Sequence, residues 1–193
     1  MKTLTLLLLT AVLGTSLAAA QSAPAPKAAP ARVSPHETTS TFIGGNYMTG
    51  SLVWVSYGRP YTKDPQTGAA RKIWGGLVPW GQPWRAGANE ASLLLNQHPM
   101  VVGNVTLQPG AYVIYLLPVE NGPSKLAFSR VTGRWGDPVD TTLDVARVDL
   151  TKGTLASPVA QFTIAIESGA GNTGTLRFSW ATTQFSVPFE IKR

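Results

Sequence analysis

The chain has 193 residues, with 16 Lys and Arg against 10 Asp and Glu, and it has no cysteine. The lack of cysteine excludes disulfides, thiol catalysis, iron–sulfur clusters and zinc ribbons. The net charge of +6 is spread over a chain of which only 13% is charged, and no run of Lys and Arg is long enough for a nucleic-acid groove. We interpret the charge as an aid to solubility, with weak attraction to acidic surfaces or polysaccharides as the alternative.

Residues 1–20 have the pattern of a secretory signal peptide. Lys2 supplies the basic region, Leu4–Leu17 the apolar region and Ala18–Ala20 the small residues of a cleavage site. A membrane anchor is less favoured, because the apolar run is shorter than the roughly 18 to 20 residues that span a bilayer. We expect an exported protein, periplasmic or extracellular, with no stable membrane insertion after cleavage.

An Ala/Pro-rich stretch follows the signal pattern. Its prolines prevent a helix and its side chains cannot supply a core, so we predict a disordered linker over residues 21–33. From residue 34 to residue 193 there is no second change of composition. This uniformity predicts a single folded domain.

Within the domain, apolar residues alternate with a period of two, which is typical of half-buried strands. Turn sequences rich in Gly, Pro and Asn separate the alternating runs. Eight to ten strands at this short spacing predict an all-β, jelly-roll-like β-sandwich with mostly antiparallel strands. In chain order, the clearest runs are Thr38–Ile43, Tyr47–Tyr57, Ala111–Leu117, Gln161–Glu167, Thr175–Ala181 and Gln184–Ile191.

Three of these details constrain the arrangement. Ala111–Leu117 is apolar on both faces, so we expect it in the centre of the sheet and covered on both sides. Pro188 has no backbone donor, so the last strand should lie at an edge or be paired on one side there. Thr142–Val148 is the only candidate for a helix, and a weak one.

The sequence contains little evidence for a metal site, a cofactor site or a catalytic nucleophile. His36 and His98 are the only histidines and stand outside any ligand-spaced motif, so we interpret both as solvent-exposed loop residues and predict no metal site. A Ser–His–acid triad would need one of them, and nothing in the sequence supports it. There is no G-x-S-x-G elbow, phosphate-binding loop or dinucleotide fingerprint, so we predict no cofactor.

The segment Arg71–Ala91, RKIWGGLVPWGQPWRAGANEA, is the strongest candidate for a site. It combines three of the six tryptophans with Gly, Pro and charged residues, and such loops often carry function on a rigid β scaffold. Arg85 would bind an anion or carboxylate with its planar fork. Glu90 would accept hydrogen bonds or act as a base, and Trp80 or Trp84 would stack on a flat or sugar-like ligand.

The same residues admit a structural interpretation. Arg85 and Glu90 could pair beneath the loop, while Asn89 bonds backbone groups that the irregular path leaves unpaired. Arg59, in YGRP just after a strand, would either point at the same carboxylate or contact a backbone carbonyl at the strand end. The tryptophans would form a carbohydrate-stacking strip or, as we favour, part of the core.

Five motifs occur in a fixed order. They are YGRP at Tyr57–Pro60, RKIWGGLVPWG at Arg71–Gly81, WRAGANEA at Trp84–Ala91, LQPGAYVIYLLP at Leu107–Pro118 and RWG at Arg134–Gly136. In order and spacing they resemble the bacterial domain-of-unknown-function family 2911, which is found in exported proteins and lipoproteins. WRAGANEA is the most specific of the five.

The resemblance implies an exported β-rich domain and no particular reaction. The chain departs from the family pattern in a longer Tyr61–Ala70 segment and in Trp74, where phenylalanine is usual. If the family has a site, the matching positions are Arg59, Arg85, Asn89 and Glu90.

Our leading functional hypothesis is a non-catalytic module that binds a small polar ligand, a glycan or a cell-envelope partner near Trp74–Glu90. One alternative is a hydrolase of envelope polymers, in which Glu90 would act with a second acid, for which Asp137 is one guess. The other is a structural envelope protein in which the WRAGANEA motif serves only to fix the loop.

Overall fold

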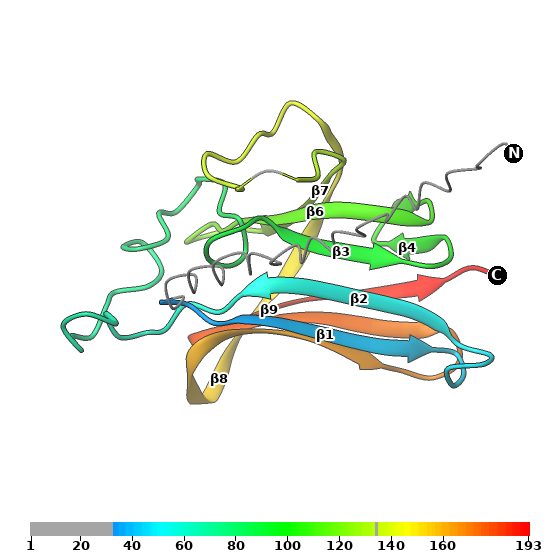
Figure 1. Cartoon of the computed structure of the whole chain (residues 1–193), viewed down its shortest axis with the longest axis horizontal. Coiled ribbons are helices and arrows are strands. Elements are labelled where there is room, and N and C mark those ends of the chain that lie inside the picture. The colour runs from blue at the N-terminus through cyan, green and yellow to red at the C-terminus, as the bar shows by residue number, and fades with distance from the viewer. Residues whose placement is uncertain (1–32, 134) are drawn as a thin grey trace, which may run out of the picture. The chain divides into compact units, whose positions relative to one another are not determined.

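The computed structural model describes residues 33–133 and 135–193. The predicted signal peptide, and all of the predicted linker except Val33, lie outside the described residues. The described residues belong to one compact unit, and every regular element among them is a β-strand (Figure 1). None of these described residues belongs to a helix long and apolar enough to cross a membrane.

The described residues form nine strands. All nine belong to one antiparallel sheet with the order β1-β2-β3-β6-β7-β8-β9-β4-β5. The strands are β1 (His36–Ile43), β2 (Ser51–Gly58), β3 (Ser92–Asn96), β4 (Met100–Val102), β5 (Val105–Leu107), β6 (Gly110–Leu117), β7 (Ser124–Ser129), β8 (Asp144–Ser168) and β9 (Thr173–Ile191).

The long strand β8 turns this sheet into a two-layered fold. Its first part, Asp144–Leu150, pairs with β7, and its second part, Thr151–Ser168, pairs with β9. Figure 1 shows β8 running from the side of β6 and β7 to the side of β1 and β9. The two halves of the sheet therefore face one another, which confirms the predicted single-domain β-sandwich.

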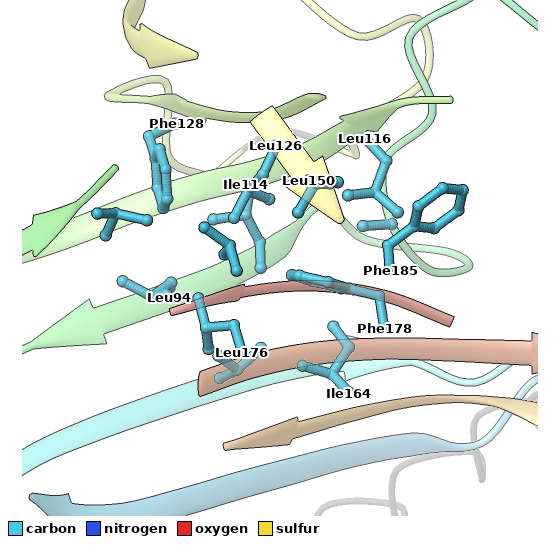
Figure 2. Packing of buried hydrophobic residues seen from close by; sticks show 14 of the residues in the cluster. Leu94, Ile114, Leu116, Leu126, Phe128, Leu150, Ile164, Leu176, Phe178 and Phe185 are labelled. Carbon is cyan, nitrogen blue, oxygen red and sulfur yellow. The ribbon is translucent and has the colours of Figure 1, made fainter. Parts of the chain in front are cut away.

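The core fills the space between the two halves. Figure 2 shows Leu94 and Ile114 on one side and Leu176 and Phe178 on the other, and all four are buried. Strand β6 lies between β3 and β7, and its residues 112–116 are all buried. Its predicted central place, covered on both sides, is confirmed.

Side chains and a short backbone pairing close the gap between the end of β2 and the second part of β8. Just beyond β2, the backbone N–H of Phe162 donates to the carbonyl of Pro60 at 2.9 Å. The hydroxyl of Tyr57 accepts a hydrogen bond from the backbone N–H of Ile164 at 3.0 Å. The Nε atom of Arg59 donates to the carbonyl of Phe162 at 3.0 Å. These bonds satisfy backbone groups that an open strand edge would otherwise expose.

Two sequence predictions near turns need correction. The second strand begins at Ser51 rather than Tyr47, because the connection before it folds on itself, with the N–H of Gly50 bonded to the carbonyl of Asn46. The helix considered for Thr142–Val148 is wrong, since the chain from Asp144 onward is extended and paired with β7. Buried Ala146, Val148 and Leu150 alternate with exposed residues there, and that period of two suits a strand.

The C-terminal region follows the prediction with two changes. The two runs Thr175–Ala181 and Gln184–Ile191 form a single strand, in which Ala181 has a φ of 51° opposite an irregular stretch of β8. Strand β9 is not an edge strand, and Pro188 is paired on neither side, because the register with β8 ends at Ser186 and the register with β4 begins at Phe189. The missing N–H of Pro188 therefore falls between the two registers, which differs from the predicted edge position or one-sided pairing.

Candidate functional site

The connection between β2 and β3, residues 59–91, is irregular but firmly attached to the sheet. Trp84 and Leu116 exchange two backbone hydrogen bonds of 2.7 and 2.8 Å, so this part of the connection runs beside β6 like a very short strand. The N–H of Gly81 also donates to the carbonyl of Pro118 at 2.7 Å. The loop therefore holds its side chains on a fixed backbone.

Small residues of the WRAGANEA motif set the path of that backbone. Ala86 is fully buried with a φ of 50°, and its carbonyl accepts a hydrogen bond from the Ser92 hydroxyl at 2.8 Å. A side chain at Gly58, the last residue of β2, would collide with the carbonyl of Ala88. The chain thus passes so close to β2 that only small side chains fit between Arg85 and Asn89.

Asn89 fixes the far end of the motif. Its φ of 65° lies in the left-handed region, which asparagine tolerates better than most residues. Its side-chain Nδ2 donates to the carbonyl of Ser34 at 3.2 Å. Asn89 therefore bonds a backbone group, as the structural interpretation of the sequence expected.

Four of the six tryptophans cluster under the loop. Trp84 stacks on Trp180 with a centroid separation of 5.5 Å, and Trp74 meets the Trp84 ring edge-on at 5.8 Å. Trp80 stacks on Trp74 at 6.0 Å, and the Nζ atom of Lys152 lies 4.8 Å from the centre of the Trp80 ring. Trp180 is fully buried and Trp74 and Trp84 pack against the core, in keeping with the core interpretation.

A cleft of about 440 Å³ lies between this loop and the connection from β7 to β8. Trp84, Arg85 and Asn89 line it, whereas Trp80, Arg59 and Glu90 are not among its lining residues. The lining residues are Val33, Ser34, Pro60, Arg71, Leu77, Pro79, Pro83, Trp84, Arg85, Gly87, Ala88, Asn89, Gly136, Asp137, Val139 and Trp180.

Arg85 forms an ion pair across this cleft. Its Nη1 atom lies 2.8 Å from Oδ2 of Asp137, with 22% of the arginine side chain and 69% of the aspartate side chain exposed. The partner suggested from the sequence was Glu90, so the expected pair is replaced by one with the β7–β8 connection. Gly136 allows this approach, because a Cβ there would lie 2.8 Å from the Cα of Ala91.

Three N–H donors on cleft-lining residues have no acceptor. They are the Nε atoms of Arg71 and Arg85 and the Nε1 atom of Trp180, and each is buried without a hydrogen-bond partner in the described part of the chain. A buried donor without a partner costs about 1 to 3 kcal/mol. All three residues line the same cleft, but the three nitrogen atoms themselves lie buried beneath its surface.

Arg59 does not contact the residues that Arg85 contacts. Besides bonding the Phe162 carbonyl, it donates from Nη2 to the Thr163 hydroxyl at 2.7 Å and forms a short ion pair with Glu37. Of the two roles predicted for Arg59, the structure shows the contact with a backbone carbonyl. It does not join Arg85 around one carboxylate.

Glu90 lies near His36, a contact that the sequence did not suggest. Oε2 of Glu90 is 3.8 Å from Nδ1 of His36, and Nε2 of His36 is 2.5 Å from the Ser56 hydroxyl. This order of groups resembles a serine–histidine–acid arrangement. Ser56, however, lies mid-strand between Thr38 and Leu93, so the backbone amides around it serve the sheet rather than an oxyanion.

Each histidine follows only part of the prediction of a solvent-exposed loop residue. His98 lies in the loop between β3 and β4 but is partly buried, with its Nδ1 3.0 Å from the Ser51 hydroxyl. His36 is exposed, but it is the first residue of β1 rather than a loop residue. Across residues 33–133 and 135–193, no group of three or more potential ligands could hold a metal ion.

A second, much smaller cavity of about 20 Å³ lies beside Arg85 under the β7–β8 connection. Tyr115 lines it and donates a short hydrogen bond to Asp144. Burial raises the pKa of the Tyr115 hydroxyl, and the bond to the Asp144 carboxylate raises it further. The phenol therefore stays protonated here and acts as a donor to Asp144.

The comparisons with known proteins agree with the motifs. The family profile described as "Protein of unknown function (DUF2911)" matches residues 34–189. No curated protein and no solved structure matches the chain. The profile covers nearly all of the compact unit, from before β1 into β9. The chain belongs to the DUF2911 family.

Proposed function

We propose that this protein is an exported, non-catalytic binding module whose cleft takes a small polar ligand. The observation that carries the proposal is the set of unsatisfied N–H donors on Arg71, Arg85 and Trp180, which all line one cleft. Ligand sites are typically concave and largely apolar, with a few polar groups that fix orientation. A ligand with acceptor oxygens would give these donors the partners that the described protein residues do not.

The rest of the cleft suits a ligand with a flat or ring-shaped body. Leu77, Pro79 and Pro83 supply apolar surface, and Trp84 supplies an aromatic ring whose position is fixed by stacking on Trp180. Rigid aromatic and proline surfaces bind sugar or aromatic rings with little loss of side-chain entropy. A small polar molecule or the terminal unit of a glycan fits this combination.

Export rests on the signal-peptide pattern of residues 1–20. An exported binding module would meet small solutes, glycans or envelope components outside the cytoplasm.

The hydrolase alternative has weaker support. Asp137 lies in the cleft, but its carboxylate is paired with Arg85, and Glu90 is not among the cleft-lining residues. Glycoside hydrolysis requires two carboxyl groups on either side of one bond. The described geometry does not bring Glu90 and Asp137 into the same cleft lining.

A ligand panel read by tryptophan fluorescence tests the proposal. The panel contains neutral sugars, sugar acids, amino acids and aromatic acids, and the purified protein is compared with its Arg85→Gln and Arg177→Gln variants. Arg177 is a matched control, because it pairs with Glu167 at 2.7 Å on the opposite half of the sheet. We expect saturable binding by at least one class, weakened by Arg85→Gln alone. A panel without any saturable response, or a response unchanged by Arg85→Gln, would contradict the proposal.

A further inference from the structure

We propose that the ligand presents a carboxylate that takes the place of Asp137 on the guanidinium of Arg85. This inference rests on the proposed binding function and names the chemical class that the cleft selects. Asp137 then acts as an internal competitor, which occupies the arginine while no ligand is bound. Three features of the cleft support this assignment.

The first feature is that one N–H donor of the Arg85 guanidinium has no acceptor. Asp137 contacts Nη1, while Nε has no acceptor, and the described residues give this guanidinium no other side-chain partner. Arginine binds a carboxylate best through two parallel N–H groups, and a side-on approach uses Nε together with one Nη. A ligand carboxylate in that orientation would use the donor that Asp137 leaves unpaired.

The second feature is the solvent exposure of the Asp137 carboxylate, which weakens its ion pair with Arg85. More than two-thirds of its side chain is exposed, at 69%, so its pairing with Arg85 is screened by solvent. Exposed ion pairs of this kind typically contribute little to stability. The pair thus shows that a carboxylate fits against this guanidinium, and its exposure allows exchange for another carboxylate at low cost.

The third feature is the charge of the cleft. Its lining contains two arginines, Arg71 and Arg85, and one acid, Asp137, which leaves one positive charge in excess. Arg71 donates to the carbonyl of Tyr61, and its Nε is unsatisfied. Its charge interacts with that of Asp64, which is not among the cleft-lining residues. A monoanion would neutralise the excess charge, whereas a neutral ligand would leave it.

The unsatisfied nitrogens are closed to solvent in this structure. An acceptor therefore reaches them only after side chains of the cleft wall move apart. Binding should accordingly combine exchange at Arg85 with a local rearrangement around Trp84 and Trp180, the stacked pair that lines the cleft.

Isothermal calorimetry with two matched pairs of probes tests the inference: benzoate against benzamide, and glucuronate against glucose. The members of each pair share a ring and differ in the carboxylate. We expect at least one acid to bind about tenfold or more tightly than its neutral counterpart, the effect of a hydrogen-bonded charge. Arg85→Gln should remove this preference, and Asp137→Asn should increase the affinity for the acid several-fold. Arg177→Gln should leave both unchanged.

The outcomes separate this inference from the proposed function. If neutral ligands bind in the cleft as tightly as the acids, the carboxylate assignment is wrong and the binding function stands. If the acids are preferred but Asp137→Asn weakens them, Asp137 is part of the site rather than its competitor, and the inference is again overturned. If none of the four probes binds, the carboxylate assignment fails, and the full ligand panel then decides the binding function. Circular dichroism of each variant confirms that it is folded.

Discussion

Nη1 of Arg85 and Oδ2 of Asp137 lie 2.8 Å apart and join the β2–β3 loop to the β7–β8 connection across a cleft. The pair brings together two segments that are distant in the sequence. A purely structural role for the WRAGANEA motif would call for an arginine that is buried and fully paired. Here the aspartate is mostly exposed and one nitrogen of the arginine lacks an acceptor.

Arg59 and Arg85 allow a structural arginine to be compared with one that we propose to bind a ligand. Their side chains are 21% and 22% exposed, yet Arg59 bonds Phe162, Thr163 and Glu37 while Arg85 pairs only with an exposed acid. Arg59→Gln should cost about 1 to 3 kcal/mol of unfolding free energy, and Arg85→Gln less than about 1 kcal/mol. Urea unfolding measures both. An equal or larger cost for Arg85→Gln would favour the structural peg.

Tyr57→Phe should destabilise the protein, because it removes a hydrogen bond between β2 and β8. The substitution removes the acceptor of the Ile164 N–H, which lies in the buried interior of the sandwich. The expected cost is about 1 to 3 kcal/mol, the penalty for an unpaired buried group. Thermal and urea unfolding provide the measurement. Tyr47→Phe is the control, because Tyr47 is 76% exposed in the β1–β2 turn and should cost almost nothing.

Alkaline unfolding should depend on the same tyrosine. Burial, the largest cause, raises the pKa of Tyr57 to about 12. Because the folded-state pKa exceeds the unfolded value of roughly 10, this contribution to stability is complete below pH 10 and is lost as the pH rises toward 12. Tyr115 shifts in the same direction. Urea midpoints measured from pH 9 to 12 should fall less steeply for Tyr57→Phe than for the natural sequence, and parallel curves would refute this assignment.

Gly58→Ala should distort the WRAGANEA loop. A Cβ at Gly58 would meet the backbone carbonyl of Ala88, which cannot move without displacing the motif. Such overpacking costs about 1 to 3 kcal/mol. Gly153→Ala is the matched control, since the nearest atom to its Cβ, the carbonyl oxygen of Gln184, would be 4.0 Å away. Unfolding free energies of the two variants should differ clearly, and similar values would show that the loop tolerates the added methyl group.

The period-two pattern predicted most of the strands because each has one face in the core. It could not show that β8 continues through residues 151–160, where the side chains are mostly exposed and the chain pairs with β9 only at residues 151–154 and 159. The bend that creates the two layers depends on this continuation. For the same reason the sequence suggested a sandwich but not its strand order.

The sequence indicated which segment holds the candidate site, but it did not indicate which side chains contact one another there. Of the residues predicted from the Trp- and Gly-rich loop, Trp84, Arg85 and Asn89 line the cleft. The pairing of Arg85 with Asp137 and of Arg59 with Glu37 could not be read from the sequence, because each depends on how distant segments meet in the folded protein. Conversely, the motif placed Glu90 near Arg85 in sequence, but its carboxylate lies toward His36.

The indole N–H resonances of Trp84 and Trp180 give the most direct test of the central claim, because both rings line the cleft and Trp180 has no acceptor for its Nε1 among the described residues. A two-dimensional ¹H–¹⁵N spectrum of the protein, titrated with the tightest-binding acid, follows both signals. We predict a saturable shift of the Trp180 signal, which disappears in Arg85→Gln and persists in Arg177→Gln. An unchanged Trp180 signal at saturating ligand, or the same shift in Arg85→Gln, would contradict a carboxylate-binding cleft centred on Arg85.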